Sequence, residues 1–177
     1  MENMFRDLKS DEIDVRISTV SDKGISLLLY KDARVDQNIL DEKYKPFGWQ
    51  RDHKELKGNI YCGISIYDKE KQQWVTKWDC GKESFTEAEK GEASDSFKRA
   101  GFNWGIGREL YTSPFIWIPA EKCNIEEDKG KITCKDKFVV EAIQITDKVI
   151  TGLAIKNLSI KLSETQKTQR VFVWKRG

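Results

Sequence analysis

Two neighbouring segments that alternate with a period of two constrain the fold of this 177-residue chain most strongly. In residues 59–67 and in residues 73–80, similar side chains recur at every second position, which is typical of β-strands. The alternating sets are Ile60, Cys62, Ile64 and Ile66 in the first segment and Trp74, Thr76, Trp78 and Cys80 in the second. The linker at 68–71 is short and polar, which favours an antiparallel turn. With a third strand at 47–51, followed by a charged loop that ends at Gly58, the pattern predicts a three-stranded meander.

The stretch after the meander contains the strongest helix signal in the chain. Thr86 with Glu89, or Ser84 with Glu87, forms a capping box at its start. At about 100° per residue, one stripe of this helix is apolar and the opposite side carries small and charged residues. The stripe consists of Ala93, Phe97, Ala100 and Trp104, and the opposite side of Gly91, Asp95, Lys98 and Arg99. Three nearby glycines predict a break near Gly101 and a second short helix through Leu110.

The segments before the meander predict a hairpin and a helix. Residues 14–18 and 25–30 flank a glycine-containing turn, and residues 32–44 then change to helical spacing. Val35, Ile39 and Leu40 lie on one side of that helix. Residues 1–12 are expected to form a short polar helix or a loose end.

The segments after the helices show a weaker periodic pattern of apolar residues. Residues 120–136 are polar and predict a loop or an edge excursion, and three strands are predicted at 138–145, 149–155 and 170–174. The order of the elements indicates an α+β fold, with an antiparallel β-sheet of hairpin and meander packed on the central helix. We expect a core domain at 1–118 and a small β-rich extension at 119–177.

Composition and motifs argue against the common enzyme classes. The chain has 31 basic and 29 acidic residues, so its net charge alone carries no nucleic-acid signature. The sequence contains no P-loop, and Gly105-Ile106-Gly107 is followed by Leu110 where a dinucleotide motif requires glycine. His53 is the one histidine available for acid–base or nucleophilic chemistry. We therefore expect no enzymatic activity and no cofactor.

Metal binding is not predicted either. The four cysteines, Cys62, Cys80, Cys123 and Cys134, form no CxxC pair, which favours structural thiols over a zinc site. The carboxylate clusters are Glu87, Glu89 and Glu92, and Glu126, Glu127 and Asp128. In so charged a chain such clusters are typical of solvated faces. They leave a metal-dependent nuclease open as an alternative.

The apolar runs are all shorter than the ~18 residues that a membrane span needs. The first residues, MENMFRDLKSDEID, contain no apolar stretch that resembles a secretory signal. We expect a cytoplasmic protein without a membrane partner.

The stretch from Lys90 to Tyr111 is the most informative for function. A helix that packs on a sheet does not require the adjacent cations Lys98 and Arg99 beside the small residues Gly91 and Ser96. Paired cations next to small residues suit a phosphate backbone. An ordinary solvated face remains the alternative explanation of the same residues.

This stretch resembles the central helix of the single-strand annealing proteins named for the eukaryotic recombination protein Rad-fifty-two, above all their compact bacteriophage and prophage members. Residues 28–35 (LLYKDARV), followed by Phe47-Gly48-Trp49, are similar to the strand, helix and Gly-Trp turn of the same family. The order of elements agrees over roughly Ile13 to Ile118. Residues 119–177 resemble the small β extension of the phage members.

The resemblance implies an oligomeric ring or arc that binds single-stranded DNA along a basic groove and anneals complementary strands in recombination and repair, without ATP hydrolysis. Lys98 and Arg99 match the Lys-Arg pair that lines this groove. A basic residue found one turn later in some members is replaced by Phe102, and Arg108 is the candidate to supply that contact. Arg16 is the nearest match to a basic residue of the first hairpin. Arg34 matches an arginine of the next helix, for which a structural ion pair is the alternative.

Aromatic residues add candidates for contacts with bases. Tyr30, Trp49 and Tyr61 are placed where rings can stack on bases, whereas Trp49 and Trp78 are better explained as core or subunit-interface residues. The expected partners are single-stranded DNA and other copies of the chain, and a single-strand binding protein or an exonuclease is left open. A duplex-RNA or duplex-DNA module is the second alternative, because a meander followed by a helix also describes such binders.

Overall fold

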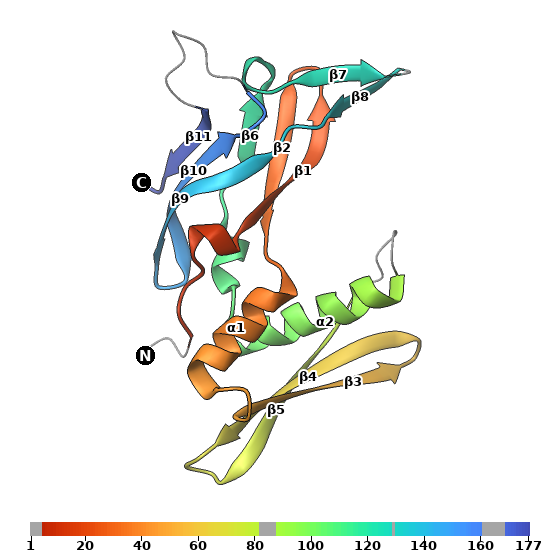
Figure 1. Cartoon of the computed structure of the whole chain (residues 1–177), viewed down its shortest axis with the longest axis vertical. Helices are drawn as coiled ribbons and strands as arrows, with labels where there is room; N and C mark the ends of the chain where they lie inside the picture. The colour runs from red at the N-terminus through yellow and green to blue at the C-terminus, as the bar shows by residue number, and fades with distance from the viewer. Residues whose placement is uncertain (1–4, 82–87, 129, 161–168) are drawn as a thin grey trace. The chain divides into compact units, whose positions relative to one another are not determined.

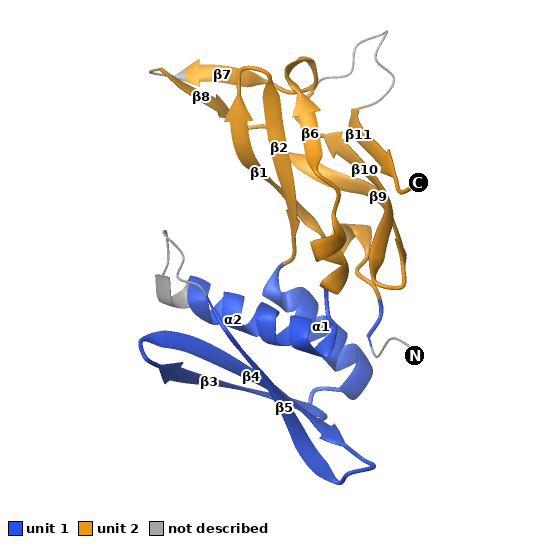
Figure 2. Cartoon of the chain, turned by 180° about the vertical axis from the view of Figure 1, so that it is seen from behind, with its two compact units in different colours: residues 1–6, 32–107 blue, residues 7–31, 108–177 orange. Residues whose placement is uncertain are grey.

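The computed structural model describes residues 5–81, 88–128, 130–160 and 169–177 (Figure 1). The chain divides into two compact units, which Figure 2 colours separately. Unit 1 comprises residues 1–6 and 32–107, and unit 2 comprises residues 7–31 and 108–177. No helix in the described ranges combines the length and the apolar character that crossing a bilayer requires.

Unit 1 is a three-stranded meander covered by a helix. Its elements are α1 (Ala33–Tyr44), β3 (Trp49–Leu56), β4 (Asn59–Asp68), β5 (Gln73–Cys80) and α2 (Ala88–Trp104). The strands lie in the order β3-β4-β5, and α2 packs on β4 and β5 (Figure 2). α1 begins at the N-cap Asp32, whose carboxylate accepts the N–H of Arg34 at 2.8 Å. It buries Ile39 and Leu40, as its spacing predicts.

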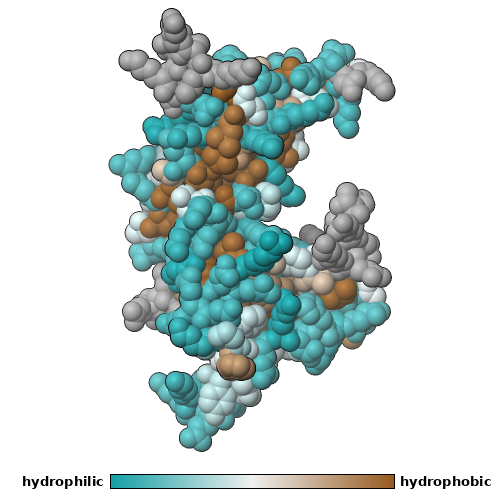
Figure 3. Space-filling view, viewed as in Figure 1, coloured by the Kyte–Doolittle hydropathy of each residue, from teal (hydrophilic) through white to brown (hydrophobic). Residues whose placement is uncertain are grey.

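Unit 2 is built on one antiparallel sheet with the strand order β11-β10-β9-β1-β2-β6. These strands are β1 (Asp14–Ser21), β2 (Gly24–Tyr30), β6 (Ile116–Pro119), β9 (Phe138–Thr146), β10 (Val149–Asn157) and β11 (Arg170–Lys175). A separate hairpin pairs β7 (Ile125–Asp128) with β8 (Lys131–Cys134), and three short 3-10 helices lie at Ser10–Glu12, Arg108–Thr112 and Ala120–Lys122. On the side shown in Figure 3, apolar residues are exposed over these strands, whereas unit 1 presents mainly hydrophilic residues.

The α+β class with antiparallel sheets is confirmed, but the hairpin and the meander belong to different sheets. The hairpin β1–β2 joins the C-terminal strands, because Asp14 of β1 pairs with Val139 of β9. The compact units therefore divide the chain differently from the boundary that we drew at residues 118 and 119. The pairing of β1 with β9 joins segments far apart in the chain, and periodicity does not encode such a long-range pairing.

Two local predictions were wrong. The charged segment after Arg51 is not a loop, because residues up to Leu56 pair with β4 in an unbroken register. The helix α2 does not break at Gly101 but continues to Trp104. There a Cβ on Gly101 would lie 3.0 Å from the carboxylate of Asp36 in α1, so the missing side chain leaves room for this carboxylate between the two helices. Of the two alternatives for residues 1–12, the short polar helix is present as the 3-10 helix Ser10–Glu12, and the segment is not loose from Phe5 onward, since Phe5 is buried and packs edge-on against Tyr44.

Other local predictions have mixed outcomes. The three C-terminal strands and the short helix through Leu110 are confirmed, the latter as the 3-10 helix at Arg108–Thr112. The polar stretch 120–136 forms the β7–β8 hairpin. Both capping boxes that we placed at the start of α2 depend on residues 84–87, which lie outside the described residues.

Candidate nucleic-acid interface

The two faces of the meander differ in what covers them. Ile64 and Cys62 of β4 are fully buried on the face toward α2, together with Phe97 of the helix. The partners of Gly63 and Ser65 across the ladder are Trp78 and Thr76, so these residues lie on the opposite face. The alternating sets of β4 and β5 therefore occupy different faces of the sheet. Trp78, which we expected in the core or at a subunit interface, is 37% exposed there.

The helix-covered face holds its polar groups in specific contacts. Trp104 donates its indole N–H to the carbonyl of Ile64 at 2.9 Å, and Lys77 lies over the Trp104 ring. Trp49 packs on Phe97 and donates to the carboxylate of Asp41 at 2.7 Å. Trp49 is thus an inward-facing residue and not an open stacking surface. These contacts fix α2 on the sheet and with it the positions of its cations.

Lys98 fits its predicted role. It lies on α2, outside the buried stripe of Phe97 and Ala100, and is half-buried. In the part of the chain that the structure describes, it has no ion-pair or hydrogen-bond partner. Its ammonium group is therefore available for an anion.

Arg99 is not on an open outer face, contrary to our expectation. Its guanidinium lies 3.4 Å from the carboxylate of Asp79 in β5, which also accepts a hydrogen bond from the side chain of Asn103. The long side chain reaches back from the flank of the helix to the sheet edge. Helical spacing predicts on which side of the helix the Cα atom lies, but it does not predict where the tip of such a long side chain lies. An anion bound by Arg99 would share it with Asp79.

The remaining candidates in unit 1 have structural contacts of their own. Arg34 is highly exposed and lies 3.7 Å from Asp32 at the start of α1. Its position fits both a contact with DNA and a structural ion pair. Tyr61 is half-buried, and the charge interaction with Cys80 raises the pKa of its phenol. Tyr61 is the direct ladder partner of Cys80, so both lie on the face of the meander opposite α2, here called the uncovered face.

Unit 2 brings two predicted residues together. Arg16 pairs with Leu28, and Asp14 pairs with Tyr30, in the β1–β2 ladder. Direct partners share a face, so Arg16 and Tyr30 lie on the same face of the hairpin, and both are exposed. Arg108 is exposed at the start of the 3-10 helix Arg108–Thr112. The predicted cations are thus distributed over both units.

Sequence reasoning missed two exposed aromatic clusters. On the uncovered face of the meander, Tyr67 and Trp74 pack edge-on with ring centroids 5.5 Å apart. In unit 2, Phe115 and Trp117 stack with an interplanar angle of 17°. The alternation of Phe115 and Trp117 with two isoleucines was a signal for the second cluster. Which side of that strand is buried became clear only from its pairing with β2.

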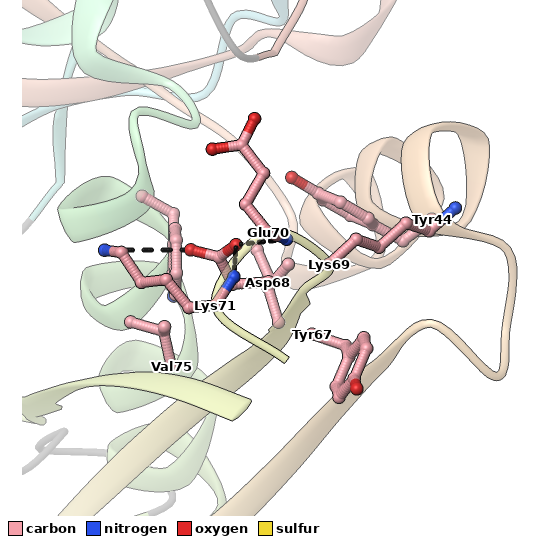
Figure 4. Close-up of a pocket in the computed structure, with 9 residues that line it drawn as sticks. Tyr44, Tyr67, Asp68, Lys69, Glu70, Lys71 and Val75 are labelled. Atoms are coloured by element: carbon pink, nitrogen blue, oxygen red, sulfur yellow. Dashed lines mark hydrogen bonds and ion pairs between the residues drawn. The ribbon is translucent and has the colours of Figure 1, made fainter. Parts of the chain in front are cut away.

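A hollow of about 460 Å³ lies at the turn between β4 and β5 (Figure 4). Tyr44, Tyr67 and the turn residues contribute to its lining. The carboxylate of Asp68 accepts the backbone N–H groups of Glu70 and Lys71 and lies 3.7 Å from the Lys71 ammonium (Figure 4). The Asp68 carboxylate therefore stabilises the turn between β4 and β5.

The groups considered for metal chemistry have structural surroundings. Burial raises the pKa of the Cys62 and Cys123 thiols to about 11, which suits inert structural cysteines. Glu92 is buried and accepts the N–H of Ile60 at 2.7 Å. Within the described ranges, the structure has no group of three or more His, Cys, Asp or Glu side chains arranged to hold a metal ion.

Comparison with known proteins identifies the family. The model of the Rad52/22 family double-strand break repair proteins matches residues 1–132, which include the hairpin, the meander and α2. No curated protein and no solved structure gave a significant match. The matched region holds Lys98, Arg99, Arg108, Arg16 and Arg34, and it covers about three quarters of the 177 residues. This chain belongs to the Rad52/22 family of double-strand break repair proteins.

Proposed function

We propose that this protein binds single-stranded DNA and anneals complementary strands as a homo-oligomer, without ATP hydrolysis and without a metal cofactor. The observation that carries the proposal is the half-buried Lys98, which has no partner among the described residues, beside Arg99 on α2, within the region that matches a DNA-repair family. Cations that project from a rigid helix contact phosphates independently of base sequence. Such contacts leave the bases available for pairing.

The proposed mechanism needs no chemical step. Lys98 and Arg99 hold the phosphates of one strand, with Arg16, Arg34 and Arg108 as further phosphate contacts. An ordered strand has already lost conformational freedom, so pairing with its complement starts from a pre-ordered template. Repetition of the same cations in an oligomer creates a basic path that the near-neutral net charge of one chain does not provide.

The direct test mixes two complementary labelled oligonucleotides with and without the protein. We expect the protein to accelerate annealing in EDTA and without nucleotide, while both strands stay intact. A strict requirement for ATP or for Mg²⁺, or shortening of the labelled strands, would contradict the proposal and favour a motor or a nuclease. Preference for a duplex over the single strands would favour the duplex-binding alternative.

We propose that copies of the chain contact each other through the uncovered face of the meander. Tyr67, Trp74 and Trp78 are each about 40% exposed there. The side chain of Trp78 lies over Gly63, where a Cβ would be 2.6 Å from the ring, and Lys54 covers the ring from 4.5 Å. Exposed aromatic residues are typical of the centre of protein–protein interfaces.

Replacing Trp74 and Trp78 by threonine should dissociate the oligomer, because threonine keeps the β-propensity of the strand but removes the aromatic surface. Light scattering should show an assembly larger than a tetramer for the parent and a smaller species for W74T/W78T. Phe47→Thr is the matched control, because Phe47 is 96% exposed outside the sheet. A parent that stays monomeric at micromolar concentrations, with and without DNA, would refute self-association.

A further inference from the structure

A pair of stacked rings lies on the surface of unit 2. Phe115 is 77% exposed and Trp117 is 37% exposed, and their ring centroids are 6.4 Å apart. Ile116 and Ile118, which alternate with them, are almost completely buried. The strand thus buries its aliphatic side and presents its aromatic side to solvent. Adjacent exposed aromatic rings form an apolar patch of the kind that marks binding surfaces.

A hollow of about 460 Å³ adjoins the first of these rings, Phe115. The ladder between β2 and β6 ends at the pair Leu27 and Ile116, although β2 continues to Tyr30. The hollow lies at this opening and is lined by apolar walls from Leu28, Leu110 and Phe115. The hydroxyl-bearing residues Ser18 and Ser113 also line it. It therefore offers a flat aromatic wall together with hydrogen-bonding groups.

A cation completes the surface. Arg16 is exposed and lies directly across the ladder from Leu28, one of the residues that line the hollow. In the described ranges no acidic group pairs with Arg16. Leu28 itself is 45% exposed, as expected for an open rim.

These three features match the parts of a nucleotide. A base has a flat face that stacks on aromatic rings and a polar edge that hydrogen-bonds, and its phosphate attracts a guanidinium. A docked apolar peptide would use the apolar area but would gain nothing from parallel rings or from an unpaired cation. We infer that Phe115 and Trp117 form a base-stacking platform for single-stranded DNA, with the hollow receiving an unstacked base and Arg16 contacting a phosphate. This inference rests on the proposed function.

The test compares two ligands of equal length, oligo(dT) and an oligonucleotide that carries no bases. The double variant F115L/W117L keeps apolar side chains but removes both rings. We expect it to bind oligo(dT) about 10- to 100-fold more weakly than the parent, since each stacked base contributes roughly a factor of ten. Its affinity for the abasic strand should equal that of the parent. Arg16→Gln should weaken binding of both ligands, and the control Phe47→Leu should change neither.

A base analogue gives an independent signal. The fluorescence of 2-aminopurine in the oligonucleotide is quenched when the base stacks, so quenching by the parent and its loss in F115L/W117L would support the platform. Equal binding of oligo(dT) by parent and variant would overturn it. A loss of oligomeric state in the variant, seen by light scattering, would assign this surface to contacts between copies. If the parent binds neither ligand, the proposed function itself fails, and this outcome is distinct from failure of the platform alone.

Discussion

Replacing Lys98 and Arg99 by alanine is expected to weaken binding of single-stranded DNA by about 100-fold, since each charge-assisted phosphate contact is worth roughly 1.5 kcal/mol. The loss should be about equal for all base sequences, because phosphate contacts carry no sequence information. The plot of log affinity against log salt should become flatter by ~0.7 per lost contact. Filter binding or fluorescence anisotropy at several salt concentrations measures both effects.

Stability must be measured on the same variants, because Arg99 also pairs with Asp79. Both side chains are partly exposed, so loss of this pair should cost at most about 1 kcal/mol. Asp79→Asn is the informative companion, because it removes the competing carboxylate and keeps Arg99. We expect D79N to bind DNA more tightly than the parent. If K98A/R99A folds, assembles and binds like the parent, the assignment of these residues to DNA is wrong.

The second large effect is expected at Phe97. Its side chain is 1% exposed, packs against Trp49 and lies under the guanidinium of Arg51 at 5.3 Å. Phe97→Ala should therefore lower the free energy of unfolding by about 3–5 kcal/mol, because it removes buried contacts and leaves a cavity between α2 and the sheet. Chemical denaturation monitored by circular dichroism measures this change.

The control for Phe97 is a phenylalanine whose side chain is exposed to solvent. Phe47 is 96% exposed, and Phe47→Ala should change the unfolding free energy by no more than about 0.5 kcal/mol. DNA binding by F97A should recover at low temperature, where the folded fraction rises. A stable F97A protein that fails to bind DNA would place Phe97 in the interface and contradict its purely structural role.

The local elements were predictable from the sequence. Alternation in β4 and β5, helical spacing with the N-cap Asp32 in α1, and the apolar stripe of α2 all come from interactions between residues close in the chain. The pair Lys98 and Arg99 was also readable from the sequence, as was its suitability for phosphate. These predictions depend only on backbone geometry and residue chemistry.

Which face of each strand is buried depends instead on contacts between distant segments. Periodicity shows that two faces differ, but the register places Trp78 on the uncovered face and Ile64 beneath α2. Long-range pairing likewise joins the hairpin to β9. The hollow beside Phe115 lies where the ladder between β2 and β6 ends. Arg99 pairs with Asp79, which lies twenty residues earlier in the chain. These outcomes depend on contacts between distant segments, whose free energy no local pattern contains.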